Sequence, residues 1–168
     1  MKKIMLLFVA MVTFASSSLF AGIPISKNDK ISPIDEIWMD MAVTVAKTNV
    51  EEGTIPCGTV IVYNGKLQST GQATEKATSV ETAIAMARLN SLEFAVIYTV
   101  NEPTAEAYNA ICKAGADAVF FVNPKEAVIA AGVQPAEAYD ESLLDTSLTQ
   151  VPVKQMDYED AAALLKQN

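Results

Sequence analysis

Hydrophobic and polar positions repeat at helical spacing in the first third of the chain and at strand spacing soon after it. Ser32-Pro33 pairs a capping residue with a proline that favours the first helical position, and the helical pattern stops before Gly53. The sequence therefore predicts a helix between these points. Its expected buried face consists of Ile34, Ile37, Trp38, Met41, Ala42, Val45 and Ala46. For Trp38, Met39 and Met41, the alternative to a core position is a ligand groove.

A hairpin and a second helix are predicted next. Residues 59–63 are β-branched or aromatic, Asn64-Gly65 is a two-residue turn signal, and residues 66–70 return the chain. Either Thr78 or Ser79 can cap the helix that follows, which we expect to end near Asn90. Its expected buried residues are Val80, Ala83, Ile84 and Ala87.

The second half of the chain alternates apolar strands with helices. Residues 94–100 and 118–122 are nearly continuous apolar runs, as expected for strands buried on both faces. The helix between them begins near Pro103 and ends at Lys113-Ala114-Gly115. Shorter helices are predicted at 125–131, 135–144 and 157–166. This order predicts a mixed sheet with helices on both faces and ligand sites at the strand ends, here 78–81 and 101–107.

The N-terminal residues have the pattern of an export signal. Lys2 and Lys3 precede the apolar run 4–14, and small residues continue to Ala21. We expect a signal peptide over 1–21, an exposed lead-in over 22–31 and one domain over 32–168. A membrane anchor is disfavoured because serines at 16–18 interrupt a run that would need roughly 20 apolar residues to span a bilayer. The expected product is periplasmic or secreted, without membrane association after cleavage.

Composition limits the chemistry. The 168 residues contain no histidine, which removes the commonest general base, the usual imidazole zinc ligand and any Ser-His-Asp triad. Without the leader lysines, Lys and Arg fall from 12 to 10 against 20 Asp and Glu, so the net charge goes from −8 to −10. Nucleic acid is therefore not an expected partner. Cys57 and Cys112 form either one disulfide or two buried thiols, and the sequence leaves both open.

Several segments resemble the guanine deaminases and tRNA adenosine deaminases. Residues 41–62, with the stretch Asn49 to Val62, resemble that family's first helix and strand. Residues 118–122 and 151–153 resemble its later strand and C-terminal approach, so the likeness runs in order from about Ile34 to the C-terminus. The resemblance implies a cytidine deaminase-like α/β fold with three layers, α-β-α, a mixed sheet of about five strands, and a homodimer.

The same resemblance implies where a metal site would lie. The family holds zinc through a His-x-Glu pair at one helix start and a Pro-Cys-x-x-Cys pair at the next. These motifs fall on Ser79 and Glu81, and on Pro103, Thr104 and Ala107. Only the glutamate and the proline are kept, and hydroxyl or methyl side chains do not hold zinc at neutral pH. We therefore expect a degenerate pocket at these five residues, with no metal and no other cofactor.

The remaining polar residues of the two junctions have more than one interpretation. Glu81 is either a vestigial proton shuttle or a first-turn carboxylate that stabilises its helix. Glu81, Glu102 and Glu106 could form a replacement cation site, which we disfavour because helix starts attract carboxylates anyway. Ser79 and Thr104 are more typical of helix caps than of nucleophiles, because no nearby base would activate them.

The sequence thus predicts an exported, catalytically degenerate deaminase-like protein that retains binding of a small molecule or a protein. Ala73 stands where an asparagine of the family usually holds the base, which implies altered substrate recognition as well. The alternative is an active zinc-dependent deaminase with non-standard metal ligands. A third interpretation is a structural or interaction module in the cell envelope.

Overall fold

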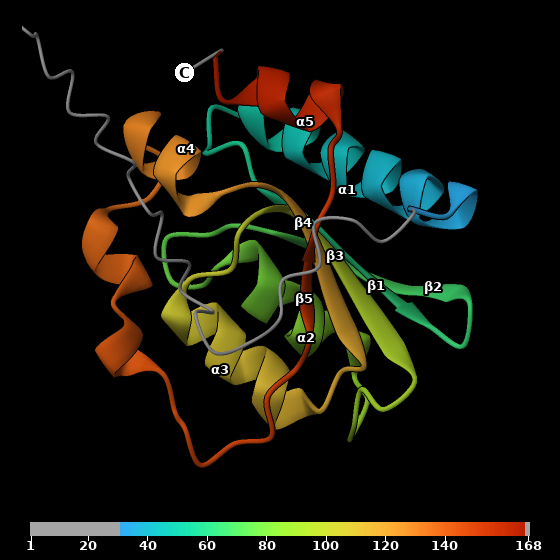
Figure 1. The fold of residues 1–168 in the computed structure, drawn as a ribbon. Coiled ribbons are helices and arrows are strands. Elements are labelled where there is room, and N and C mark those ends of the chain that lie inside the picture. The colour runs from blue at the N-terminus through green and yellow to red at the C-terminus, as the bar shows by residue number, and fades with distance from the viewer. Residues whose placement is uncertain (1–30, 167–168) are drawn as a thin grey trace, which may run out of the picture.

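A five-stranded sheet with helices on both faces forms the protein (Figure 1). The computed structural model describes residues 31–166, so the predicted signal peptide and all of the lead-in except Ile31 lie outside the described residues. The strands are β1 (Gly58–Tyr63), β2 (Lys66–Gln72), β3 (Ala95–Asn101), β4 (Ala118–Asn123) and β5 (Val153–Gln155). The helices are α1 (Pro33–Glu51), α2 (Ser79–Ala87), α3 (Ala105–Ala114), α4 (Lys125–Ala130) and α5 (Glu159–Leu164).

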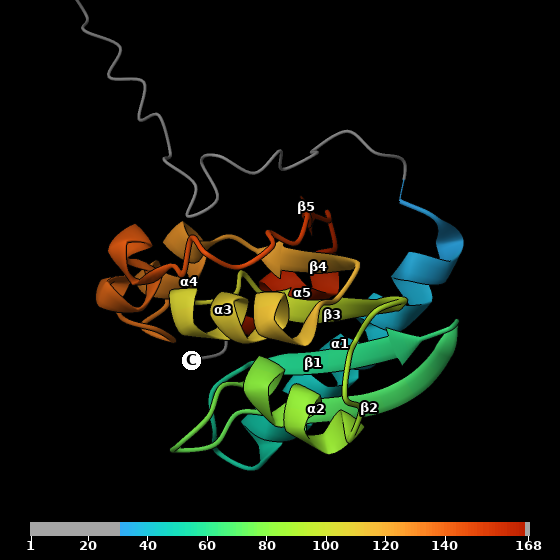
Figure 2. The same ribbon diagram turned by 90° about the horizontal axis from the view of Figure 1, so that it is seen from below.

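The sheet is mixed, as predicted. Its strand order is β2-β1-β3-β4-β5. Strand β1 runs antiparallel to β2 and β3, whereas β3, β4 and β5 are parallel to one another. Helices α2 and α3 cover one face and α1 and α5 the other, each face with its own apolar cluster (Figure 2). Within residues 31–166, no helix combines the length and apolar character needed to cross a bilayer.

Helix α1 begins as predicted, but its buried face agrees only in part with the predicted one. Ser32 Oγ accepts a hydrogen bond from the Asp35 N–H, and the Asp35 carboxylate accepts one from the Ser32 N–H, which closes the predicted cap. Ile34 and Ile37 are 52% and 55% exposed, so their predicted core positions are wrong. Ala42 and Ala46 are buried as predicted, together with Met39, Val43 and Asn49. Apolar residues lie on several sides of this helix, so helical spacing alone does not choose the buried side.

Three other boundaries differ from the prediction. Helix α2 ends at Ala87 rather than near Asn90, because Arg88 adopts a left-handed conformation with φ of 54°. Phe94 lies before β3 and is 59% exposed. The helix predicted over 135–144 is two 3-10 helices, Ala136–Tyr139 and Glu141–Leu143.

Two glycines let helices lie directly on strands. A Cβ on Gly58 would overlap the Ala42 carbonyl oxygen of α1, and a Cβ on Gly71 would overlap the Ser79 carbonyl oxygen of α2. The backbone of β2 therefore contacts the first turn of α2. This contact holds the start of α2 against the sheet, where the candidate site lies.

Candidate functional site

The starts of α2 and α3 enclose a small buried cavity of about 30 Å³. Four of the five predicted site residues line it, namely Ser79, Pro103, Thr104 and Ala107. The fifth, Glu81, lines a neighbouring hollow of about 240 Å³. The predicted junctions thus meet in space, but Glu81 is separated from the others.

The start of α2 is closed by Thr78 and Glu81. Glu81 Oε2 accepts hydrogen bonds from the Thr78 N–H and the Thr78 hydroxyl, both at 2.9 Å. Thr78 Oγ1 in turn accepts one from the Glu81 N–H at 3.2 Å. The Glu81 carboxylate is therefore engaged in a capping box. The cap is Thr78, so the interpretation of Ser79 as a helix cap is wrong.

Ser79 instead belongs to a buried row of hydroxyl groups. Its Oγ lies 2.9 Å from Thr59 Oγ1 of β1, and Thr59 Oγ1 donates to Thr99 Oγ1 of β3 at 3.0 Å. The Cys57 thiol is a second hydrogen-bond neighbour of the Ser79 hydroxyl, which has one proton to donate. The Ser79 side chain is 4% exposed, so its hydroxyl is engaged with these interior groups rather than with solvent.

Cys57 borders the same cavity as Ser79. Burial raises the pKa of the Cys57 thiol, and hydrogen bonds with Ser79 and Ala73 lower it less. A thiol whose pKa is raised by burial is a poor nucleophile and a poor metal ligand at neutral pH. Cys57 and Cys112 are both buried and both free, so the structure contains two thiols rather than a disulfide.

The start of α3 also lacks a side chain suited to bind a metal. Thr104 is the N-cap, as predicted, and its Oγ1 accepts a hydrogen bond from the Ala107 N–H at 3.2 Å. Ala107 contributes only a methyl group to the cavity wall. Thr104 and Ala107 are 7% and 1% exposed, so both side chains lie in the interior.

These residues do not fit a zinc ion. The two hydroxyls of Ser79 and Thr104 are engaged in the hydrogen bonds described above, and Ala107 has no donor atom. Across residues 31–166, no three Cys, Asp or Glu side chains converge in a way that could hold a metal. The disfavoured replacement site is not assembled, because Glu102 lines the buried cavity whereas Glu81 and Glu106 line the outer hollow.

Glu102 is the most unusual group of the cavity, and the sequence did not single out its burial. It is 5% exposed, and its Oε2 accepts a hydrogen bond from the Lys125 N–H at 2.8 Å. Its Oε1 is buried and has no hydrogen-bond partner among residues 31–166. Burial raises the pKa of Glu102 to about 7, although the Lys125 N–H acts in the opposite direction.

Three more polar residues of the site were missed as site residues. Thr59 and Thr99 interrupt otherwise apolar strands, a signal that could have located them. Tyr139 lies in a 3-10 helix, where no periodic pattern points to it, and its hydroxyl donates to the Glu102 carbonyl oxygen at 3.3 Å. Burial and the nearby Glu102 raise the Tyr139 pKa, so its hydroxyl stays protonated at neutral pH.

Two buried asparagines join the cavity to the far side of the sheet. Asn101 Nδ2 donates to the Pro56 carbonyl oxygen at 3.0 Å, and Asn123 Nδ2 donates to Asn101 Oδ1 at 3.0 Å. Asn123 Nδ2 also donates to the Ala161 carbonyl oxygen of α5 at 3.1 Å. The strand ends are thereby fixed to the loop that carries Cys57 and to α5.

Replacing Asn101 with Ala should lower the free energy of unfolding by about 2 kcal/mol, because it leaves the Pro56 carbonyl oxygen without its hydrogen bond from Asn101 and removes one of the two acceptors of Asn123 Nδ2 in the interior. Urea denaturation of both proteins measures the difference. Asn109→Ala, at a partly exposed asparagine of α3, serves as the matched control and should cost less. An Asn101→Ala variant as stable as the parent would contradict a structural role for this chain of amides.

The sequence matches no family model and no curated protein. Solved deaminases have the same fold. The guanine deaminase of Bacillus subtilis is 26% identical over 79% of this chain and 91% of its own, with a TM-score of 0.60. That of Nitrosomonas europaea is 15% identical over 84% and 87%, with a TM-score of 0.63. A tRNA A34 deaminase is 20% identical over 77% and 99%, with a TM-score of 0.60.

Proposed function

Because the chain has the fold of the cytidine deaminase-like superfamily, we propose that it is an exported form of this fold that binds a small molecule or a protein and does not catalyse deamination. The observation that carries the proposal is the pair of helix starts around the small cavity. The three positions that align with the zinc ligands present two engaged hydroxyls and one methyl group.

Loss of the metal removes the chemistry on which hydrolytic deamination depends. In such enzymes zinc lowers the pKa of its bound water to about 7 and so generates the nucleophile at neutral pH. The retained carboxylate, Glu81, is occupied by its own helix cap. The cavity measures only about 30 Å³. Pockets that enclose small molecules usually start at roughly 300 Å³. A nucleobase therefore has neither an activated water nor space at this position.

The cellular location is part of the proposal. Lys2-Lys3, the apolar run and the small residues up to Ala21 support export to the periplasm or the medium. A homodimer, as the resemblance implies, and the lack of nucleic-acid binding remain predictions.

The test uses the full chain expressed with its leader in a bacterial host. Intact mass of the purified product reports cleavage after Ala21, and elemental analysis reports its metal content. Ammonia release is then measured with guanine, adenine and cytosine compounds, with the Bacillus subtilis guanine deaminase as the positive control. We expect far less than one zinc ion per chain and no turnover. Stoichiometric zinc together with ammonia release would instead establish an active deaminase with non-standard ligands.

A further inference from the structure

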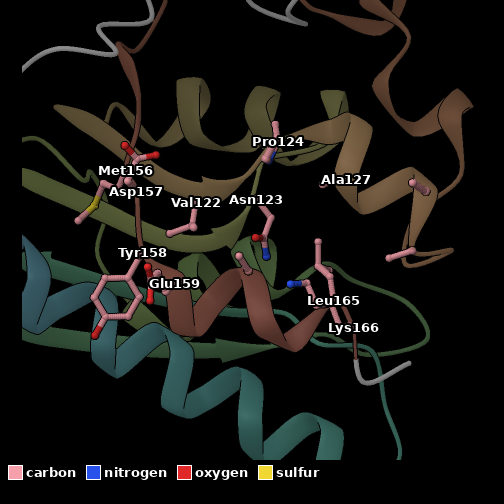
Figure 3. Close-up of a pocket in the computed structure, with 13 residues that line it drawn as sticks. Val122, Asn123, Pro124, Ala127, Met156, Asp157, Tyr158, Glu159, Leu165 and Lys166 are labelled. Atoms are coloured by element: carbon pink, nitrogen blue, oxygen red, sulfur yellow. The ribbon is translucent and has the colours of Figure 1, made fainter.

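We propose that a second cavity, between α4 and α5, binds a small molecule with an apolar body and a cationic amino group (Figure 3). Its volume is about 770 Å³. Small-molecule pockets usually measure from roughly 300 Å³ to roughly 1000 Å³, so this cavity is of the right size. It shares no lining residue with the cavity at the starts of α2 and α3. The inference is therefore independent of whether that other site holds zinc.

The floor of the cavity is fixed before any ligand binds. It is formed by the end of β4 and the residues that lead into α4, around Asn123 and Pro124. The Asn123 side chain is 2% exposed and is held from two sides, by Asn101 Oδ1 and by the Ala161 carbonyl oxygen. A preformed floor lowers the entropic cost of binding, which favours a specific site over a transient opening.

The walls are apolar and are built from short side chains. Helix α4 contributes Ala127 and Ala130, and α5 contributes Ala162. Alanine methyl groups do not fill the space between two helices, whereas Met156 and Leu165 close the apolar surface around it. The geometry thus leaves room for an apolar ligand body between the helices, with no buried charge to oppose it.

The charges at the rim select the head group. Asp157 and Glu159 lie at one end of the cavity and Lys166 at the other, as Figure 3 shows. Both carboxylates are exposed, and the salt bridge observed within residues 31–166 joins Lys47 to Asp160, so neither is part of it. An amino group at the first end gains from two carboxylates, whereas a carboxylate ligand meets only the single ammonium of Lys166 at the other end, so the rim as a whole favours a cation.

Tyr158 lies between these two carboxylates and helps to define the same end of the site. Its hydroxyl donates to Asp40 Oδ1 of α1 at 3.2 Å, which restrains the ring beside the cavity. An ammonium group near an aromatic face gains a further cation–π attraction. The net charge of −8 of the whole chain also favours the approach of cations over anions.

Three probes with the same apolar body separate the contributions of charge and apolar contact. Octylamine, 1-octanol and octanoate are titrated into the isotopically labelled protein, and amide chemical shifts report the position and affinity of binding. Octylamine should bind most tightly and perturb the amides of Ala127 and Ala162, octanol should bind more weakly at the same place, and octanoate should bind weakest. Equal affinities for all three, or shifts only elsewhere on the protein, would overturn the proposal.

Variants test the site itself. Ala127→Trp and, from the opposite wall, Ala162→Trp fill the cavity and should each abolish the octylamine shifts, with circular dichroism to show that the variants fold. Asp157→Asn combined with Glu159→Gln should weaken octylamine roughly tenfold, as loss of about 1.4 kcal/mol implies, and leave octanol unchanged. Glu51→Gln with Glu52→Gln removes the same charge from exposed positions at the end of α1, outside the cavity, and should change neither. Unaltered octylamine binding in the folded Trp variants would overturn the assignment.

Discussion

Changing Ser79 to His, Thr104 to Cys and Ala107 to Cys together should give the protein one tightly bound zinc ion per chain, whereas we expect none in the parent. The three residues line one cavity between the starts of α2 and α3, so one imidazole and two thiolates would converge from the two helices. Such a donor set suits zinc and leaves a fourth position open. Elemental analysis after dialysis measures the zinc, and the visible absorption of the cobalt-substituted protein reports tetrahedral coordination by thiolates.

Two further variants make this result interpretable. The pair Thr104→Cys and Ala107→Cys alone supplies only two ligands and should lose its metal on dialysis. A second triple variant places the last cysteine at Glu106 instead of Ala107, and Glu106 is exposed and does not line the cavity. It should bind zinc far more weakly. If the first triple variant folds and still retains no zinc, the alignment of these helix starts with the deaminase motifs is wrong.

The free energy of unfolding should fall as pH rises from about 4.5 to about 7, because Glu102 is held in its protonated form in the folded state. Burial raises its folded pKa to about 7 from an ordinary value of 4.5. Between these values the unfolded chain has lost this proton and the folded chain keeps it, so each increase in pH favours unfolding. The contribution is fully present below the lower pKa and lost above the higher one, and it amounts to about 3 kcal/mol.

Glu102→Gln isolates this contribution from the other carboxylates. The amide mimics the protonated acid, so the variant should gain about 3 kcal/mol over the parent between pH 4 and pH 8. Urea denaturation of both proteins across that range measures the difference. Glu106→Gln, four residues along the chain and exposed, is the control and should show no such trend. A difference that does not change with pH would mean that folding does not raise the pKa of Glu102.

Much of the fold could be predicted because the local signals and the final packing agree. Asn64-Gly65 predicted the β1–β2 turn, and the two residues have positive φ values of 49° and 71°. A two-residue hairpin turn of this kind requires positive φ at both central positions. The apolar runs that became β3 and β4 are long enough only for strands buried on both faces. The buried side of α1 could not be predicted, because Met39 and Val43 offer an apolar stripe as good as the one through Ile34 and Ile37.

The candidate site could be predicted only in part, because some of it depends on packing between segments far apart in the sequence. Motif order placed Ser79, Thr104 and Ala107 together, since each motif falls at the start of its own helix. The unpartnered oxygen of Glu102 depends on how α4 packs against the end of β3, which involves residues 23 positions apart. The cavity between α4 and α5 likewise depends on how two separate segments pack, and no local sequence pattern predicts the spacing between these helices.

The helix starts that face the small cavity are capped by side chains of the chain itself. Thr78 with Glu81 caps one helix start, and Thr104 caps the other, so the N–H groups of Glu81 and Ala107 in the two first turns have partners within the chain. These caps do not depend on an ion bound between the two helices. A fold closed in this way stays intact at this corner when no metal binds there.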